Sequence, residues 1–278
     1  MARIPEVAAG LLLGTALLQG QWPNYPAAGE PRRADGKVDL NAPAPRAADG
    51  HPDLSGIWDR GMPAGVAAGR GSGPNPGGAP GAGRGPRPFQ DLPSMLPDGL
   101  PMQPWASELR AKRLEQNSKD HPDAHCLPLN PVQLNSHPQP RKIIQTPKLV
   151  LMLFEANDGI RQIFMDGRPL PGPDVEPWWY GYSIGHWDGD TLVVETTGFR
   201  EIGWLDEEGT PVTSQGKVTE RFRRVNYGTM EIGITVDDPK TFTKPWSVTL
   251  NQRLMPDTDL IEFVCMENNT SIKHLVGK

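Results

Sequence analysis

Glu220 is the acidic residue whose position in this sequence most suggests chemistry. The segment Lys217–Arg224 is predicted to be a β-strand in which Glu220 shares an otherwise apolar face with Val218 and Phe222. The next predicted strand, Thr229–Val236, has a continuous apolar face, and packing the two apolar faces together would bury Glu220. Burying a carboxylate is costly unless it is hydrogen-bonded or paired, and burial raises the pKa of a carboxyl group unless donors compensate. Glu220 is therefore expected to be either an acid–base residue or a bonded structural carboxylate.

Candidate partners for Glu220 lie in a predicted β-hairpin, GYSIGHWDGDTLVVETTG at 181–198. Asp188-Gly189 signals a two-residue turn, because Asp-Gly tolerates the positive φ angles of a type I′ turn. Folding about that turn pairs Trp187 with Asp190 and His186 with Thr191. One face of the hairpin then carries Tyr182, Ile184, His186, Thr191, Val193 and Glu195. The opposite face has an apolar centre made of Trp187, Leu192 and Val194.

The two faces of the hairpin lead to different chemistry. If the lumen is polar, the first face points inward, and Glu220, His186 and Glu195 form a candidate catalytic acid–base set. If the lumen is packed and dry, the second face points inward and His186 is exposed. In a later strand, Gln252 shares a face with Val248, Leu250 and Leu254, so it is expected to point inward as well.

The densest aromatic cluster of the chain precedes the hairpin, in EPWWYGYS at 176–183. Four aromatic residues could line the mouth of a barrel and stack on a flat or sugar-like ligand: Trp178, Trp179, Tyr180 and Tyr182. Alternatively, the rings plug one end of the barrel as part of its core. The candidate ligand-binding residues are Trp178, Trp179, Tyr182 and Gln252.

The sequence lacks the motifs of several common classes of enzyme. It has no HExxH, Walker A loop, dinucleotide-binding GxGxxG, CxxC or GxSxG. His121, His125 and Cys126 lie close together in HPDAHC, but no second ligand pair accompanies them, so we predict no metal site and no cofactor. The net charge of −5 argues against a basic face for nucleic acid. The expected partner is a small molecule.

Strand patterns dominate the chain from Lys142 onward. They are KIIQT, KLVLMLFE, IRQIFMDG, the hairpin, KVTERFRR, TMEIGITV, WSVTLNQRL and LIEFVCME, with turn signals between them. Such a series, without a long helical period, favours an all-β fold, an antiparallel up-and-down barrel. A short strand is expected earlier, at 54–59, and one short helix over Pro104–Asn117, where proline suits the first turn. The stretch between them and the barrel, His121–Pro140, is expected to be irregular.

The N-terminal half is predicted to be mostly irregular. Residues 1–20 have the features of a secretory signal peptide, whose apolar run Val7–Leu18 is too short to span a bilayer; a buried N-terminal helix is the alternative. Residues 21–88 form an irregular arm with a Gly/Pro-rich linker at 61–88, and 89–278 form the barrel domain. The expected location is periplasmic or secreted, with no stable membrane span after signal removal. In such a chain Cys126 and Cys265 are expected to form a disulfide, with two buried thiols as the alternative.

Several of these motifs occur together in a known group of proteins. LSGIW, IIQTPKLVLMLFE, RQIFMDGRPLP, GYSIGHWDGDTLVVETTGF and MPDTDLIEFVCMENN resemble a widespread family of exported environmental bacterial proteins of unassigned function. The resemblance covers most of 52–269 apart from the Gly-rich tract, and it implies an exported, β-rich single domain. Gly56 and Trp58 are also similar to the G-x-W strand that opens lipocalin-type barrels, which implies a barrel of lipocalin-like character.

Three functions are consistent with the sequence. The leading hypothesis is a barrel that binds a small, partly apolar or aromatic ligand. The second is a cofactor-independent lyase, isomerase or hydrolase that uses inward Glu and His residues. The third is a structural surface protein with a dry barrel.

Overall fold

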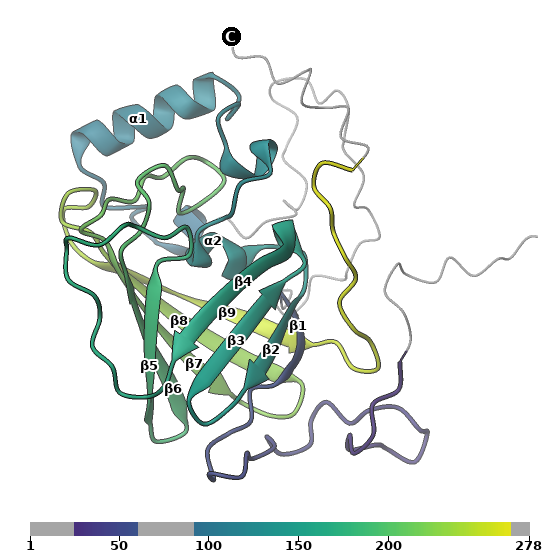
Figure 1. Cartoon of the computed structure of the whole chain (residues 1–278). Coiled ribbons are helices and arrows are strands. Elements are labelled where there is room, and N and C mark those ends of the chain that lie inside the picture. Colours follow the sequence, from purple (N-terminus) through teal and green to yellow (C-terminus); the bar gives the residue numbers. More distant parts are fainter. Residues whose placement is uncertain (1–24, 61–91, 268–278) are drawn as a thin grey trace, which may run out of the picture.

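The computed structural model describes residues 25–60 and 92–267, and this part of the chain forms a closed β-barrel (Figure 1). Neighbouring strands are antiparallel everywhere except at β4–β5, which is parallel, and β1 closes the ring by pairing with both β2 and β9. The predicted all-β barrel is confirmed, with this one parallel pair as the departure from a fully antiparallel order. The strands follow one another around the barrel in chain order: β1 (Gly56–Arg60), β2 (Arg141–Gln145), β3 (Leu149–Phe154), β4 (Gly159–Phe164), β5 (Tyr182–Asp188), β6 (Thr191–Thr197), β7 (Lys217–Arg224), β8 (Thr229–Asp237) and β9 (Trp246–Leu254).

Side chains along the strands alternate between the inside and the outside of the barrel. Along β8 and β9 nearly every second residue is buried, as expected for strands with one face on a core. Glu220 on β7 pairs with Ile234 on β8, and both side chains are buried in the lumen as predicted. A side chain beside a water-sized void would keep some accessible surface, so this part of the lumen is packed and dry. The inward side chains without accessible surface include Val194, Val218, Ile232, Ile234 and Leu250.

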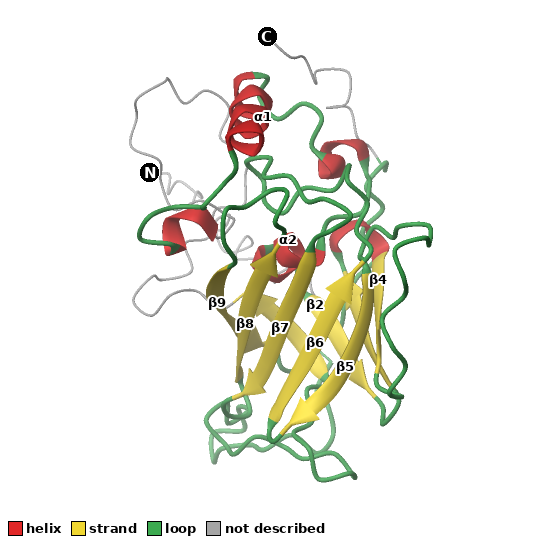
Figure 2. Ribbon diagram, turned by 90° about the vertical axis from the view of Figure 1, so that its left-hand side faces the viewer, coloured by secondary structure: helices red, strands yellow, loops and turns green. Residues whose placement is uncertain are grey.

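A short helix closes one end of the barrel. Helix α2 (Pro131–Ser136) lies over that end (Figure 2), and all of its residues are buried. Asn130 caps the helix, because its side-chain oxygen accepts a hydrogen bond of 2.9 Å from the Val132 amide, and Pro131 suits the first turn. The segment that we expected to be irregular therefore contains a buried helix. Helix α1 (Pro104–Glu115), outside the barrel, confirms the predicted short helix.

The β5–β6 hairpin keeps its predicted faces but not its predicted register. Asp188 pairs with Thr191, so the turn residues are Gly189 and Asp190, and His186 pairs with Val193. Gly189 has a φ angle of +58° whereas Asp190 has no positive φ, which is the pattern of a type II′ turn with glycine in its first position. Because the register differs by two residues, each side chain stays on its predicted face. The apolar face is the inward one.

One predicted strand is wrong. Residues 260–267 contain no strand, and β9 pairs instead with β1, which takes the barrel edge that the predicted strand would have needed. The predicted disulfide is confirmed: Cys126 and Cys265, with Cα atoms 5.6 Å apart, join the chain after β9 to the loop before α2.

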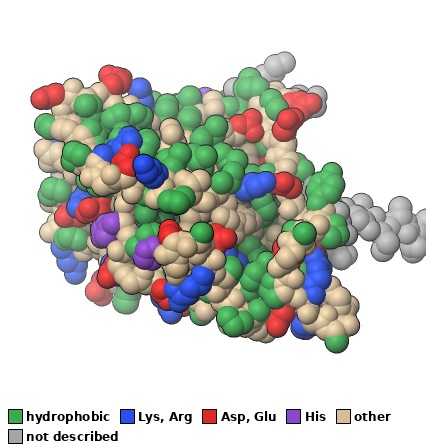
Figure 3. Space-filling model, turned by 60° about the horizontal axis from the view of Figure 1, so that its bottom comes forward, with side chains coloured by type: hydrophobic (Ala, Val, Ile, Leu, Met, Phe, Trp, Pro, Cys, Tyr) green, Lys and Arg blue, Asp and Glu red, His purple; other side chains and the backbone are tan. Residues whose placement is uncertain are grey.

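Residues 25–55 form an N-terminal arm that passes the end of the barrel opposite α2, at the bottom of Figure 1. Arg46 forms an ion pair with Asp190 at 2.7 Å, and His51 stacks on Trp187 at 4.6 Å, so the arm is attached to the hairpin. On the face that Figure 3 shows, acidic, basic and apolar side chains are interspersed. The predicted signal peptide (1–20) and linker (61–88) lie outside the described residues, and the domain boundaries stay predictions. No described helix has the length and apolar character needed to cross a membrane.

Candidate binding site

Glu220 lies fully buried in the lumen and is bonded through both carboxylate oxygens. Arg161 on β4, also buried, donates from Nη1 to Oε1 at 3.0 Å and from Nη2 to Oε2. Asn135 on α2 donates from Nδ2 to Oε1 at 2.7 Å. These donors compensate for the lost hydration of the carboxylate, which is the condition for keeping a charged group inside a core. The geometry matches the structural alternative for Glu220, a bonded carboxylate.

Glu220, Arg161 and Asn135 form a buried polar centre, which extends to further polar side chains on other strands. Arg161 also donates to the Ser183 hydroxyl, from Nε at 3.2 Å and from Nη2 at 3.1 Å. On the other side, Gln252 Nε2 donates to the backbone carbonyl of Asn135 at 3.0 Å. Gln252 therefore points inward as predicted, but it supports helix α2 and lines neither of the pockets described below.

The structure does not bring His186 and Glu195 to Glu220. His186 is exposed, and Glu195 forms an ion pair with Lys217 on the outer surface of the barrel. The physical reason is strand parity, because the apolar face of the hairpin fills the dry lumen and leaves these two side chains on the opposite face. The expected acid–base set is not assembled.

The three predicted aromatic residues, Trp178, Trp179 and Tyr182, line a single groove in the barrel wall. We call it the seam groove; it lies between Ile160–Phe164 of β4 and Trp178–Ser183, with Pro128 at its edge, and has a volume of about 270 Å³. It forms at the junction with the fewest paired residues, because the parallel β4–β5 junction has only two residue pairs. Beyond those pairs, the aromatic segment lies alongside β4 in place of a paired strand.

Aromatic contacts fix the rings of the seam groove. The ring of Tyr182 lies 5.1 Å from that of Phe164 and 5.2 Å from that of Trp178. Arg168 covers Phe164 at 3.9 Å and donates to the Tyr182 hydroxyl at 3.1 Å. Gly198, with a φ angle of +71°, lies against Trp178, where an added Cβ would come within 3.1 Å of the indole. A glycine at this position lets the indole rest on the backbone.

The floor of the seam groove is the polar centre of the barrel. Arg161 and Ser183 are buried and line the groove, and the charge of Arg161 is compensated by Glu220. Near the rim, the guanidinium groups of Arg168 and Arg200 are each paired with a carboxylate. The described residues that line the groove thus offer aromatic faces and hydrogen-bonding groups, and their one charged side chain is paired.

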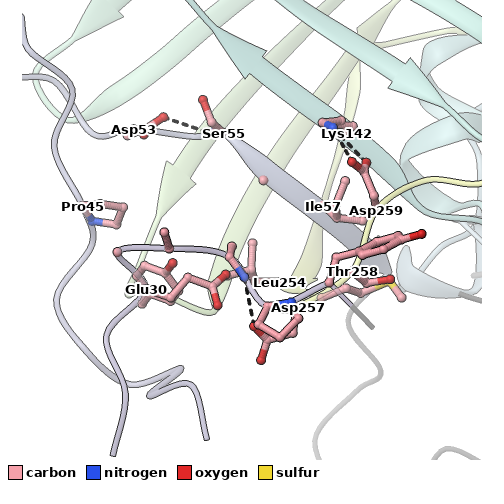
Figure 4. Close-up of a pocket in the computed structure, with 18 of the residues that line it drawn as sticks. Glu30, Pro45, Asp53, Ser55, Ile57, Lys142, Leu254, Asp257, Thr258 and Asp259 are labelled. Atoms are coloured by element: carbon pink, nitrogen blue, oxygen red, sulfur yellow. Dashed lines mark hydrogen bonds and ion pairs between the residues drawn. The ribbon is translucent and has the colours of Figure 1, made fainter. Parts of the chain in front are cut away.

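A second, more polar pocket lies between the arm, β1 and the chain after β9, with a volume of about 580 Å³ (Figure 4). Lys142 and Asp259 form an ion pair at 2.8 Å on one side of it. On another side, Arg32 joins Glu30 and Asp257, and burial together with the neighbouring Asp257 raises the pKa of Glu30. No predicted site residue lines this pocket, and these charged groups are paired with each other, so it is not our candidate site.

His121, His125 and Cys126 do not form a metal site. Cys126 is in the disulfide, His125 is bonded to a backbone carbonyl, and His121 contacts the Gln133 amide at 2.9 Å. Within 25–60 and 92–267, no group of three His, Cys, Asp or Glu residues is placed to hold a metal ion. His137, at the C-terminal end of α2, is nearly fully buried, and burial lowers its pKa to about 4.

Sequence reasoning missed Arg161 and Asn135, the two partners of Glu220. Strand parity is the signal that could have found Arg161, because it shares a face of β4 with Ile163 and both are buried. For Asn135 the available signal was Asn130-Pro131, a typical helix start that precedes it by five and four residues. Neither signal identifies Glu220 as the partner, since that contact crosses the lumen.

Comparison with known proteins adds no relative: no protein-family model, curated protein or solved structure matches this chain. The resemblance to a family of exported bacterial proteins therefore stays a prediction. The candidate site depends on its geometry alone.

Proposed function

We propose that this protein binds a small, partly apolar or aromatic ligand in the seam groove. The observation that carries the proposal is the convergence of Trp178, Trp179 and Tyr182 on one concave site. Trp178 keeps 38% of its surface exposed, which supports ligand contact over the alternative role as a core plug. The volume of about 270 Å³ is just below the range of about 300–1,000 Å³ for drug-sized ligands, so it suits a ligand of one or two rings.

The test is a titration with 2-naphthol, a neutral two-ring probe, followed by the ¹H–¹⁵N signals of the indole N–H groups. We expect saturable shifts and an affinity about tenfold lower in Trp178→Ala, because stacking and apolar contact are lost. Trp105→Ala is the matched control, since Trp105 is 43% exposed on α1 and does not line the groove. Absence of saturable binding, or equal weakening in both variants, would contradict the proposal.

The packed lumen supports one second candidate from a different class, a structural protein with a dry barrel. This candidate predicts that the same titration shows no saturable shift at any groove residue. The acid–base enzyme has no such support, because His186 and Glu195 lie outside the barrel and Glu220 inside it.

We also propose that the protein works outside the cytoplasm, in the periplasm or as a secreted protein. The Cys126–Cys265 disulfide supports this location, since structural disulfides persist in oxidising compartments. Mass spectrometry of native material should show the loss of about 20 N-terminal residues, as for a cleaved signal peptide. A mature protein that retains Met1 would overturn this proposal.

A further inference from the structure

We infer that the ligand of the seam groove is an uncharged molecule that carries acceptor oxygens beside a flat ring, such as an aromatic lactone, ketone or ester. The inference rests on the proposed function and names the class of ligand for that site. Three properties of the groove carry it: the pairing of its charges, the hydrogen-bonding groups it leaves free, and its size.

The charges of the residues that line the groove favour an uncharged ligand. Arg161, on the floor, is held by a two-point ion pair with Glu220 and by hydroxyl groups. Near the rim, Arg168 pairs with Asp166 and also donates to the Tyr182 hydroxyl. A carboxylate or ammonium group that entered the groove would lose hydration without gaining an unpaired counter-ion from the residues that line it.

Three aromatic side chains that line the groove carry hydrogen-bond donors without a partner among the described residues. The hydroxyl of Tyr180 lies over Gly159, where an added Cβ would come within 2.6 Å of it, and it makes no hydrogen bond to a described residue. The indole N–H groups of Trp178 and Trp179 likewise have no acceptor among the described residues. Trp178 is 38% exposed, and neither the Tyr180 hydroxyl nor the Trp179 indole N–H is a fully buried polar atom without a partner, so these two groups keep accessible surface.

Each of these three groups carries a proton that it can donate in a hydrogen bond. An indole N–H can only donate a hydrogen bond. Burial and the nearby Asp158 raise the pKa of Tyr180 to about 12, so its phenol keeps its proton at physiological pH. The indole N–H groups can be satisfied only by an acceptor, and the Tyr180 hydroxyl can donate to one as well. Carbonyl or ester oxygens next to an aromatic ring supply such acceptors and fit the aromatic walls.

The experiment compares four two-ring probes in the intact protein: coumarin, naphthalene, 2-naphthoate and 2-naphthylmethylammonium. Dissociation constants come from the indole N–H shifts. Coumarin, a neutral lactone, should bind tightest, with naphthalene about three- to tenfold weaker, as expected for one neutral hydrogen bond. Both ions should bind more weakly than naphthalene. Tightest binding of either ion, or equal binding of coumarin and naphthalene, would overturn the inference.

A variant isolates the role of the Tyr180 hydroxyl. Tyr180→Phe should weaken coumarin by about three- to tenfold and leave naphthalene unchanged, because only the donor is removed. Tyr25→Phe, on the exposed part of the arm, is the matched control and should change neither affinity. Equal weakening of both probes in Tyr180→Phe would mean that the hydroxyl acts only through packing, and would refute the inference. If none of the four probes binds, the proposed function itself fails; if they bind with the wrong preference, only the ligand class fails.

Discussion

Removing either partner of the buried Arg161–Glu220 ion pair should destabilise the fold more than removing both. Arg161→Met leaves the Glu220 carboxylate with Asn135 as its only remaining donor, and Glu220→Met leaves a buried guanidinium without a counter-ion. Each single substitution should lower the free energy of unfolding by about 3–5 kcal/mol, the usual cost of an uncompensated buried charge.

The double variant should cost much less than the sum of the two single variants. The Asn135 amide loses its acceptor, at about 1–3 kcal/mol, while Ser183 and Thr196 keep the 2.9 Å hydrogen bond between their own hydroxyls. The coupling energy between the two positions is then at least about 3 kcal/mol. It is a large share of the roughly 5–15 kcal/mol that stabilises an ordinary domain.

Urea unfolding with the disulfide intact, monitored by tryptophan fluorescence, measures this coupling. The exposed cross-strand pair Arg223–Glu231, at 2.6 Å on the outer face of the barrel, supplies the matched cycle and should give less than about 1 kcal/mol. A coupling at Arg161–Glu220 no larger than that of the surface pair would refute the reasoning. It would mean that water reaches the polar centre.

Other expected outcomes follow from single features of the structure. The folded pKa of His137, about 4, lies below the unfolded value of 6.5. As the pH falls from 6.5 to 4 the unfolded state binds the proton first, so the free energy of unfolding should fall by about 3 kcal/mol in all. His137→Gln should weaken the dependence of the urea midpoint on pH across that window, and an unchanged dependence would contradict this. Replacing both disulfide cysteines by serine opens a loop with a sequence separation of 139 and should cost up to about 5 kcal/mol in urea, whereas an unchanged midpoint would exclude a stabilising bridge. Gly198→Ala should weaken 2-naphthol binding by displacing Trp178, while Gly29→Ala, at a φ angle of +84° with nothing near its Cβ, shares the backbone strain but should leave binding unchanged; equal effects would show that the indole is not displaced.

The sequence alone could predict which side chains share a face of each strand. Alternation in β7 and β8 placed Glu220 inside, and alternation in the last strand did the same for Gln252. The hairpin shows why this kind of prediction is robust: its turn was misplaced by one residue, yet the shift of two in register left every side chain on its predicted face. Side-chain parity depends only on local geometry, which the residues themselves set.

The tertiary structure decided which of those residues act together. The predicted set of Glu220, His186 and Glu195 is split by the barrel wall, because the choice of inward face depends on how the whole lumen packs. Arg161 meets Glu220 only because β4 and β7 face each other across a closed barrel, a contact between residues 59 apart in the chain. The seam groove likewise exists because β4 and β5 run parallel and pair at only two positions, so the aromatic residues between them line a cleft. Composition and spacing specify the aromatic cluster and the inward carboxylate, whereas long-range strand pairing determines what each of them contacts.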